Sequence, residues 1–193
     1  MKPDLTVLFV PGLRDHVEDH WQTILARKIP GSHTVAPLES NKLSCEARVA
    51  ALDAAYRKLT GPVVLVAHSA GVMITVHWVR RHAPRIHGAL LAAPADLETP
   101  LPAGYPGIYD LASNGWLPIP QDRLNFPAIV AASTNDPLAR FNRVEGFAHA
   151  WGARLVNVGA VGHLNPAAGF GEWKQGEELV DELWTTGLQR VSV

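Results

Sequence analysis

The sequence predicts an α/β fold, a three-layer sandwich in which helices cover both faces of a mainly parallel β-sheet. Short apolar runs alternate along the chain with longer segments of helical periodicity, as expected where strands are joined by helical crossovers. The runs are apolar throughout, rather than alternately apolar and polar, which is typical of strands buried on both faces. At 193 residues the chain can form one domain with a substantial core, so we expect a single domain over residues 1–193.

The apolar runs predict about six strands. Five runs are strong and one is weaker, and together they are Leu5–Val10, His33–Ala36 (the weaker run), Val63–Ala67, His87–Ala93, Ala128–Ala132 and Arg154–Val158. The predicted helices between and after them are His20–Lys28, Cys45–Leu59, Ala70–His82, Pro137–Trp151 and Glu172–Trp184. Ser44 and Asp136 stand where N-caps are expected, and Pro137 is suited to a first helical position.

The segment from Pro94 to Pro127 interrupts this alternation. It is rich in proline but too apolar for a disordered linker, so we expect an ordered excursion at one end of the sheet. The chain has no room for a large helical cap domain, and this excursion is the candidate cover for a binding site. We expect Tyr105, Tyr109 and Trp116 to line a shallow apolar wall there.

Composition narrows the function classes. The formal net charge is −1 and 18% of residues are charged, which argues against nucleic acid or an anionic membrane surface as the main partner. The single cysteine cannot form an internal disulfide. The N-terminal apolar run is too short for a signal-peptide core, and no run approaches the length of a membrane span. We therefore expect a cytoplasmic protein with no membrane association.

The most informative stretch is "VVLVAHSAGVMITVHW", residues 63–78. A serine, Ser69, stands where a buried strand passes directly into a helix, and such a sharp turn exposes the hydroxyl beside the free N–H groups of the helix. The usual pattern of this turn is Gly-x-Ser-x-Gly, and here Ala67 replaces the first glycine while Gly71 keeps the second. The pattern predicts a nucleophilic serine; the alternative is that Ser69 only caps the helix.

A nucleophilic serine needs a base and an orienting acid, in the chain order Ser, Asp or Glu, His for this type of turn. Asp136 and His163 each follow a predicted strand, so both should reach the sheet edge where Ser69 lies. Asp136 could also cap a helix, and His163 could be an ordinary loop histidine. Asp110 and Asp96 are the reserve acids. We expect His68 to support the turn rather than act as the base.

Two further features concern the surroundings of the serine. The oxyanion hole should consist of the backbone N–H of Ala70 and a second N–H from the loop after the first strand. Leu13 is the predicted second donor, with Arg14 in reserve. The segment "HVEDH", residues 16–20, does not have the spacing of a helical zinc motif and lies near loop residues. We expect no metal site.

These motifs resemble the small serine hydrolases of the retinoblastoma-binding-protein-9/YdeN family, within the α/β-hydrolase fold. The resemblance covers nearly the whole chain, through "VPGL", "AHSAG", "APAD", "ASTNDP" and, most specifically, "GHLNPAAGFGEWKQG". It implies Ser69 as nucleophile, Asp136 as acid and His163 as base. It also implies hydrolysis of small carboxylic esters or related acyl compounds through an acyl-enzyme, with no cofactor. The sequence leaves open the natural substrate, the bond type and the oligomeric state.

A protein-binding module with little catalytic activity is the alternative function. Some relatives carry a Leu-x-Cys-x-Glu motif that engages a pocket protein. Here "LSCEA" supplies Leu43 and Cys45, but Glu46 comes one place early and Ala47 stands in its position. A shift by one residue on an extended peptide turns the side chain to the opposite face, so we expect no such interaction.

Overall fold

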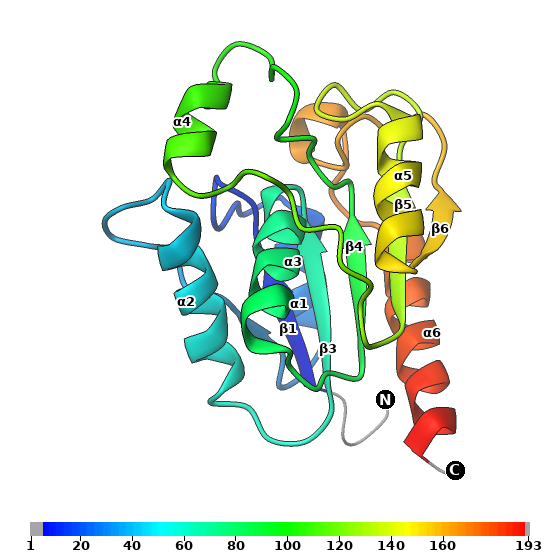
Figure 1. The fold of residues 1–193 in the computed structure, drawn as a ribbon. Helices are drawn as coiled ribbons and strands as arrows, with labels where there is room; N and C mark the ends of the chain where they lie inside the picture. Colours follow the sequence, from blue (N-terminus) through cyan, green and yellow to red (C-terminus); the bar gives the residue numbers. More distant parts are fainter. Residues whose placement is uncertain (1–5, 192–193) are drawn as a thin grey trace.

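A computed structural model describes residues 6–191 of the chain and contains one sheet of six parallel strands (Figure 1). The strands lie in the order β2-β1-β3-β4-β5-β6, and every pairing between neighbours is parallel. Their bounds are β1 Thr6–Val10, β2 His33–Thr34, β3 Val63–His68, β4 Gly88–Ala92, β5 Ala128–Ala132 and β6 Arg154–Asn157. This confirms the predicted fold class. Leu5, which we expected at the start of the first strand, lies outside the described residues.

Helices cover both faces of the sheet. Their bounds are α1 Trp21–Lys28, α2 Cys45–Tyr56, α3 Ala70–His82, α4 Ile108–Ser113, α5 Phe141–Trp151 and α6 Lys174–Val191. Figure 1 shows α2, α3 and α5 in front of the sheet, with α1 and α6 behind it. A single 3₁₀ turn, Pro166–Ala168, follows β6 in the described part of the chain.

Each central strand contributes to two separate cores, which explains why the runs are apolar at every position. In β3, Val63, Leu65 and Ala67 belong to the core that packs against α2, α3 and α5. Val64 and Val66 belong to the core that packs against α1 and α6. Successive strand side chains point to opposite faces, so a strand covered on both sides is apolar at successive positions.

The α5 helix corrects one predicted boundary. It begins at Phe141, not at Pro137, and its N-cap position is Arg140 rather than Asp136. The Asp136 carboxylate instead accepts the Leu138 N–H at 2.8 Å, which holds this segment in a turn that competes with helix formation. By contrast, Ser44 caps α2 as predicted, because its hydroxyl accepts the Ala47 N–H at 3.2 Å.

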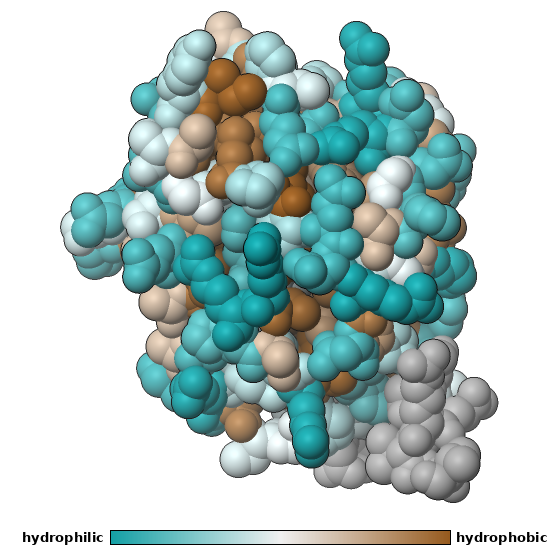
Figure 2. All heavy atoms as spheres, in the orientation of Figure 1, coloured by the Kyte–Doolittle hydropathy of each residue, from teal (hydrophilic) through white to brown (hydrophobic). Residues whose placement is uncertain are grey.

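The proline-rich segment 94–127 is an ordered excursion: its first part, with α4, lies above the carboxyl ends of β3 and β4, and its last part returns along the front of the sheet to the start of β5 (Figure 1). Figure 2 shows brown, apolar surface near the top of this face, in the region of the excursion. Only one of its three predicted wall residues lines a cavity, Tyr105. Tyr109 is 87% exposed, and Trp116 is fully buried with its indole N–H donating to the Leu43 carbonyl. The predicted wall was therefore wrong for Tyr109 and Trp116.

Among residues 6–191, no helix is both long enough and apolar enough to span a lipid bilayer.

Candidate active site

Ser69 occupies a strained turn between β3 and α3. Its backbone has φ 57° and ψ −126°, a conformation that L-residues with a side chain seldom adopt. Two hydrogen bonds hold it there: the Ser69 N–H donates to the Ala92 carbonyl, and the Val72 N–H donates to the Ser69 carbonyl, both at 3.0 Å. The hydroxyl is thereby presented at the carboxyl edge of the sheet, where parallel α/β proteins bind ligands.

The glycine two residues after Ser69 is required by a close approach of backbone to backbone. A Cβ at Gly71 would stand 2.1 Å from the Val10 carbonyl oxygen and 2.8 Å from that of Pro11. The small residue two places before the serine, Ala67, is under less constraint. Its side chain fits, fully buried, in the core that packs against α2, α3 and α5. This difference explains why the first glycine of the usual pattern can be alanine while the second cannot.

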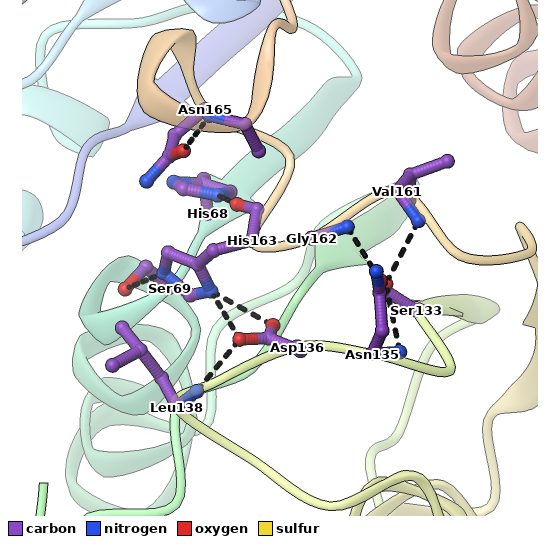
Figure 3. A network of polar contacts seen from close by, with 11 residues as sticks. His68, Ser69, Ser133, Asn135, Asp136, Leu138, Val161, Gly162, His163 and Asn165 are labelled. Carbon is purple, nitrogen blue, oxygen red and sulfur yellow. Dashed lines mark hydrogen bonds and ion pairs between the residues drawn. The ribbon is translucent and has the colours of Figure 1, made fainter. Parts of the chain in front are cut away.

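The structure brings Ser69, Asp136 and His163 together in one chain of hydrogen bonds (Figure 3). Nε2 of His163 lies 2.8 Å from the Ser69 hydroxyl oxygen. Nδ1 of His163 lies 2.8 and 3.0 Å from the two carboxylate oxygens of Asp136. Ser69 follows β3, Asp136 follows β5 and His163 follows β6, so the parallel strands deliver all three to the same edge.

The partners of His163 define its tautomer. A carboxylate only accepts hydrogen bonds, so Nδ1 carries the proton and donates it to Asp136. Nε2 of the neutral ring therefore has a free electron pair facing the Ser69 hydroxyl, which donates to it. The side chains of Asp136 and His163 are 2% and 5% exposed, and in this arrangement the ring can take a proton from the serine.

A second set of hydrogen bonds joins the loop after β5, which carries Asp136, to the loop after β6, which carries His163 (Figure 3). The Gly162 N–H donates to the Asn135 side-chain oxygen at 2.7 Å, and the Val161 N–H donates to the Ser133 hydroxyl at 3.2 Å. The Ser133 hydroxyl itself donates to Asn135 at 2.9 Å. Each loop lacks regular secondary structure, so these contacts hold Asp136 and His163 at a constant separation.

His68 contacts the loop that carries His163. Its Nε2–H donates to the backbone carbonyl of His163 at 2.8 Å, and its ring centroid lies 4.8 Å from that of His163. Burial and the neighbouring His163 and His20 hold the pKa of His68 well below its usual range. The ring is therefore neutral. We expected His68 to support the turn at Ser69; its hydrogen bond is to the loop that carries His163.

A cavity of about 150 Å³ opens above Ser69. Leu13, Arg14 and Ala70 line it, and within residues 6–191 no protein acceptor is found for the backbone N–H of any of the three. The predicted oxyanion donors therefore face the same space as the serine. Both Leu13 and the reserve donor Arg14 remain available as the second amide.

Sequence reasoning missed several residues that line this cavity, among them His20, Leu97, Leu101 and Asn165, whereas Tyr105 was predicted as part of its wall. His20 belongs to the "HVEDH" segment, which was considered only for metal binding. Asn165 lies two residues after His163 in "GHLNP", a spacing that signals a shared loop but not which way the side chain points.

The reserve acids have other partners. The Asp110 carboxylate accepts the Gly107 N–H at the start of α4. Asp96 is buried, and its carboxylate forms an ion pair with Arg143 at 3.3 Å. In the described part of the chain, no group of three or more His, Cys, Asp or Glu side chains is arranged to bind a metal ion.

The fold and the site together define a class of protein. A parallel sheet with a serine on a strained strand-to-helix turn, facing a histidine oriented by an aspartate, is characteristic of serine hydrolases of the α/β-hydrolase fold. The serine hydrolase family model matches residues 7–182, and the chain belongs to this family.

Similarity to solved structures identifies a family within this class. A structure described as a YdeN-like hydrolase from Pectobacterium atrosepticum is 32% identical over 95% of this chain and 92% of its own, with a TM-score of 0.81. The ydeN gene product from B. subtilis is 17% identical over 94% and 99%, with a TM-score of 0.69. The protein is thus a small serine hydrolase of the YdeN family.

A more distant structure shares the fold. Est1E from Butyrivibrio proteoclasticus, with ferulic acid bound, is 10% identical over 97% of this chain and 90% of its own, with a TM-score of 0.69. No curated protein matches the chain.

Proposed function

We propose that the protein is a serine esterase that cleaves small acyl esters through Ser69, His163 and Asp136. The observation that carries the proposal is the continuous hydrogen-bond chain from the Ser69 hydroxyl through His163 to Asp136, at 2.8 Å for each step. The cavity beside it supplies a place for the acyl group. Est1E, which shares the fold, was solved with ferulic acid bound, and BorB, another structure with this fold, is a type II thioesterase.

The chemistry follows from the orientation of His163. Its Nε2 takes the hydroxyl proton as the Ser69 oxygen attacks the substrate carbonyl carbon, and Asp136 stabilises the imidazolium that forms. The carbonyl oxygen becomes an oxyanion, which the N–H groups of Ala70 and Leu13 stabilise. Collapse of this intermediate breaks the bond to the leaving group, which receives the proton from Nε2. Water then attacks the acyl-enzyme by the same steps, releasing the acid and restoring Ser69.

The cavity volume supports a small acyl group. A protein cavity of about 150 Å³ holds a molecule of the size of benzene, which corresponds to an acyl chain of about six carbons or fewer. The walls beside Ser69 are mostly apolar, with Leu97, Leu101, Tyr105 and Leu138 among the lining residues.

Labelling with a fluorophosphonate probe tests the proposal directly. The wild-type protein should become covalently labelled at Ser69, and Ser69→Ala should abolish both labelling and ester turnover. Ser113→Ala, the same change at an exposed position on α4, is the matched control and should be labelled like the wild type. Labelling that persists in Ser69→Ala would show that Ser69 is not the nucleophile. A wild type that neither labels nor hydrolyses esters would support the protein-binding alternative instead.

A further inference from the structure

The cavity above Ser69 has two chemically different sides. One is apolar and comes from the segments after β4 and β5, with Leu97, Leu101, Tyr105 and Leu138. The other is polar and comes from the start of α1, the end of β3 and the loop after β6, with His20, His68 and Asn165 among others. Figure 3 shows Leu138 and Asn165 on opposite sides of Ser69. A substrate attacked by Ser69 therefore extends in two directions with different surroundings.

His20 lines the polar side and carries a hydrogen-bond donor on its ring. Its Nδ1 accepts the Gln22 N–H at 3.2 Å, so in the neutral ring the proton is on Nε2. The residue is 8% exposed, and within residues 6–191 no partner is found for Nε2. Burial, and to a lesser extent the charge of His163, lowers the pKa of His20 to about 4, so the ring stays neutral and remains a donor at neutral pH.

Asn165, in the loop after β6, presents a second donor. Its side-chain oxygen accepts the Ala168 N–H at 3.0 Å, which caps the 3₁₀ turn and fixes the orientation of the amide. The amide nitrogen is then left with two N–H groups and no protein acceptor in the described part of the chain. Both residues line the cavity, so both donors are available to a bound molecule.

The polar side is the side of the leaving group. His163 must hand its proton to the leaving oxygen, so the leaving group lies against this ring. Asn165 follows His163 by two residues on the same loop. His20 is linked to the same region by the ring of His68, which contacts both histidines. The centroid of the His68 ring lies 4.6 Å from that of His20 and 4.8 Å from that of His163. The apolar side is left for the acyl chain.

We propose that His20 and Asn165 recognise an oxygen acceptor on the leaving group, so that the preferred substrates are short-chain acyl esters of oxygenated alcohols, such as glycol ethers and polyols. This inference rests on the proposed esterase function and names the substrate class of that site. The leaving group of a simple alkyl ester would displace water from both donors without replacing the hydrogen bonds that the water made. The site therefore discriminates against such an apolar isostere.

Two isosteric esters test the proposal: 2-methoxyethyl butanoate and n-butyl butanoate, which differ by one ether oxygen in place of a methylene. The measured quantity is the ratio of their kcat/KM values, compared between variants so that the intrinsic reactivities of the esters cancel. Asn165→Asp keeps the oxygen that caps Ala168 and replaces the donor by an acceptor. His20→Asn keeps an acceptor for Gln22 and removes the Nε2 donor. Each variant should lower the ratio by about three- to tenfold, which corresponds to the free-energy contribution of one hydrogen bond.

Asn142→Asp, the same charge change at an exposed position on α5, is the matched control and should keep the wild-type ratio. Should both cavity variants fold poorly, the wild-type ratio is compared with that for hydroxide-catalysed hydrolysis of the same esters, and we expect it to be higher by a similar factor. An unchanged ratio in folded variants, or a wild-type ratio equal to that of hydroxide, overturns the inference while esterase activity through Ser69 stands. Absence of Ser69-dependent hydrolysis of either ester overturns the proposed function and the inference with it.

Discussion

The contact between Gly71 and the end of β1 makes a sharp prediction about stability and activity together. In Gly71→Ala the new methyl carbon would meet the Val10 carbonyl oxygen at 2.1 Å, more than an ångström closer than ordinary van der Waals contact. The carbonyl belongs to the backbone and the position of a Cβ is fixed by the backbone, so no side-chain rotation relieves the overlap. The α3 helix must instead move away from β1 and carry Ser69 with it.

The magnitude follows from two opposing effects. Overpacking of this kind costs about 1–3 kcal/mol or more, while replacing a helical glycine by alanine gains about 1 kcal/mol. Because the overlap at Gly71 is severe and rigid, the cost lies at the upper end of this range, and we expect a net loss of about 2 kcal/mol or more in the free energy of unfolding. Displacement of Ser69 by about 1 Å should also lower kcat/KM by a factor of about 100.

Gly146→Ala on α5 is the matched control. No atom outside its own helix backbone lies within 4 Å of the position a Cβ would take, so only the helix propensity changes. This variant should be more stable by about 1 kcal/mol and as active as the wild type. Urea denaturation and kcat/KM for 4-nitrophenyl butanoate measure both quantities. If Gly71→Ala were as stable and as active as Gly146→Ala, the reasoning about the turn would be refuted.

Three other predictions concern the site. The double change Ser69→Ala with His163→Ala should lower kcat little more than either single change, because the two act as a unit; multiplying losses would show that His163 is not the base. Asp136→Asn should lower kcat by about 10⁴-fold, while Asp110→Asn should leave it near the wild-type value. Across 4-nitrophenyl esters from acetate to palmitate, kcat/KM should level off or fall beyond about four to six carbons, where no wall is left to bury each further methylene; a steady rise would reveal a deep acyl tunnel. Finally, His20 has a pKa of about 4 in the folded protein, which is below its value in the unfolded chain. As the pH drops, the unfolded chain therefore binds the proton first, and the free energy of unfolding falls between about pH 6.5 and pH 4. Urea unfolding of His20→Asn should show a smaller loss over this range, by up to about 3 kcal/mol, and equal losses would contradict the buried neutral ring.

The central strands, the elbow and the order of the three polar residues were predictable from sequence because each depends on local pattern. The β3 strand and α3 differ in periodicity, and the change falls directly at Ser69. Asp136 and His163 could be placed because parallel strands end at one edge, whatever the detailed packing. The structure brings these three together, and their catalytic roles remain a prediction for the labelling experiment.

What could not be predicted depends on contacts between distant segments. The start of α5 was placed at Pro137 on its helix-favouring signals, but the Asp136 carboxylate binds the Leu138 N–H and delays the helix. Trp116 and Tyr109 are both aromatic residues of one excursion, but only Trp116 is buried in the core, with its indole N–H donating to the Leu43 carbonyl. The position of His20 in the cavity depends on how α1 lies beside β3, which no spacing in the sequence records.

The excursion between β4 and β5 has a consequence for how the active site could be divided. Ser69 lies before this segment in the chain, and Asp136 and His163 lie after it, while β4 and β5 pair side by side in the sheet. Cleavage at the exposed tip near Tyr109 would therefore yield two complementary fragments, neither carrying a complete set of reacting groups. Hydrolysis by a mixture of the two would then report directly on reassembly of the sheet between β4 and β5.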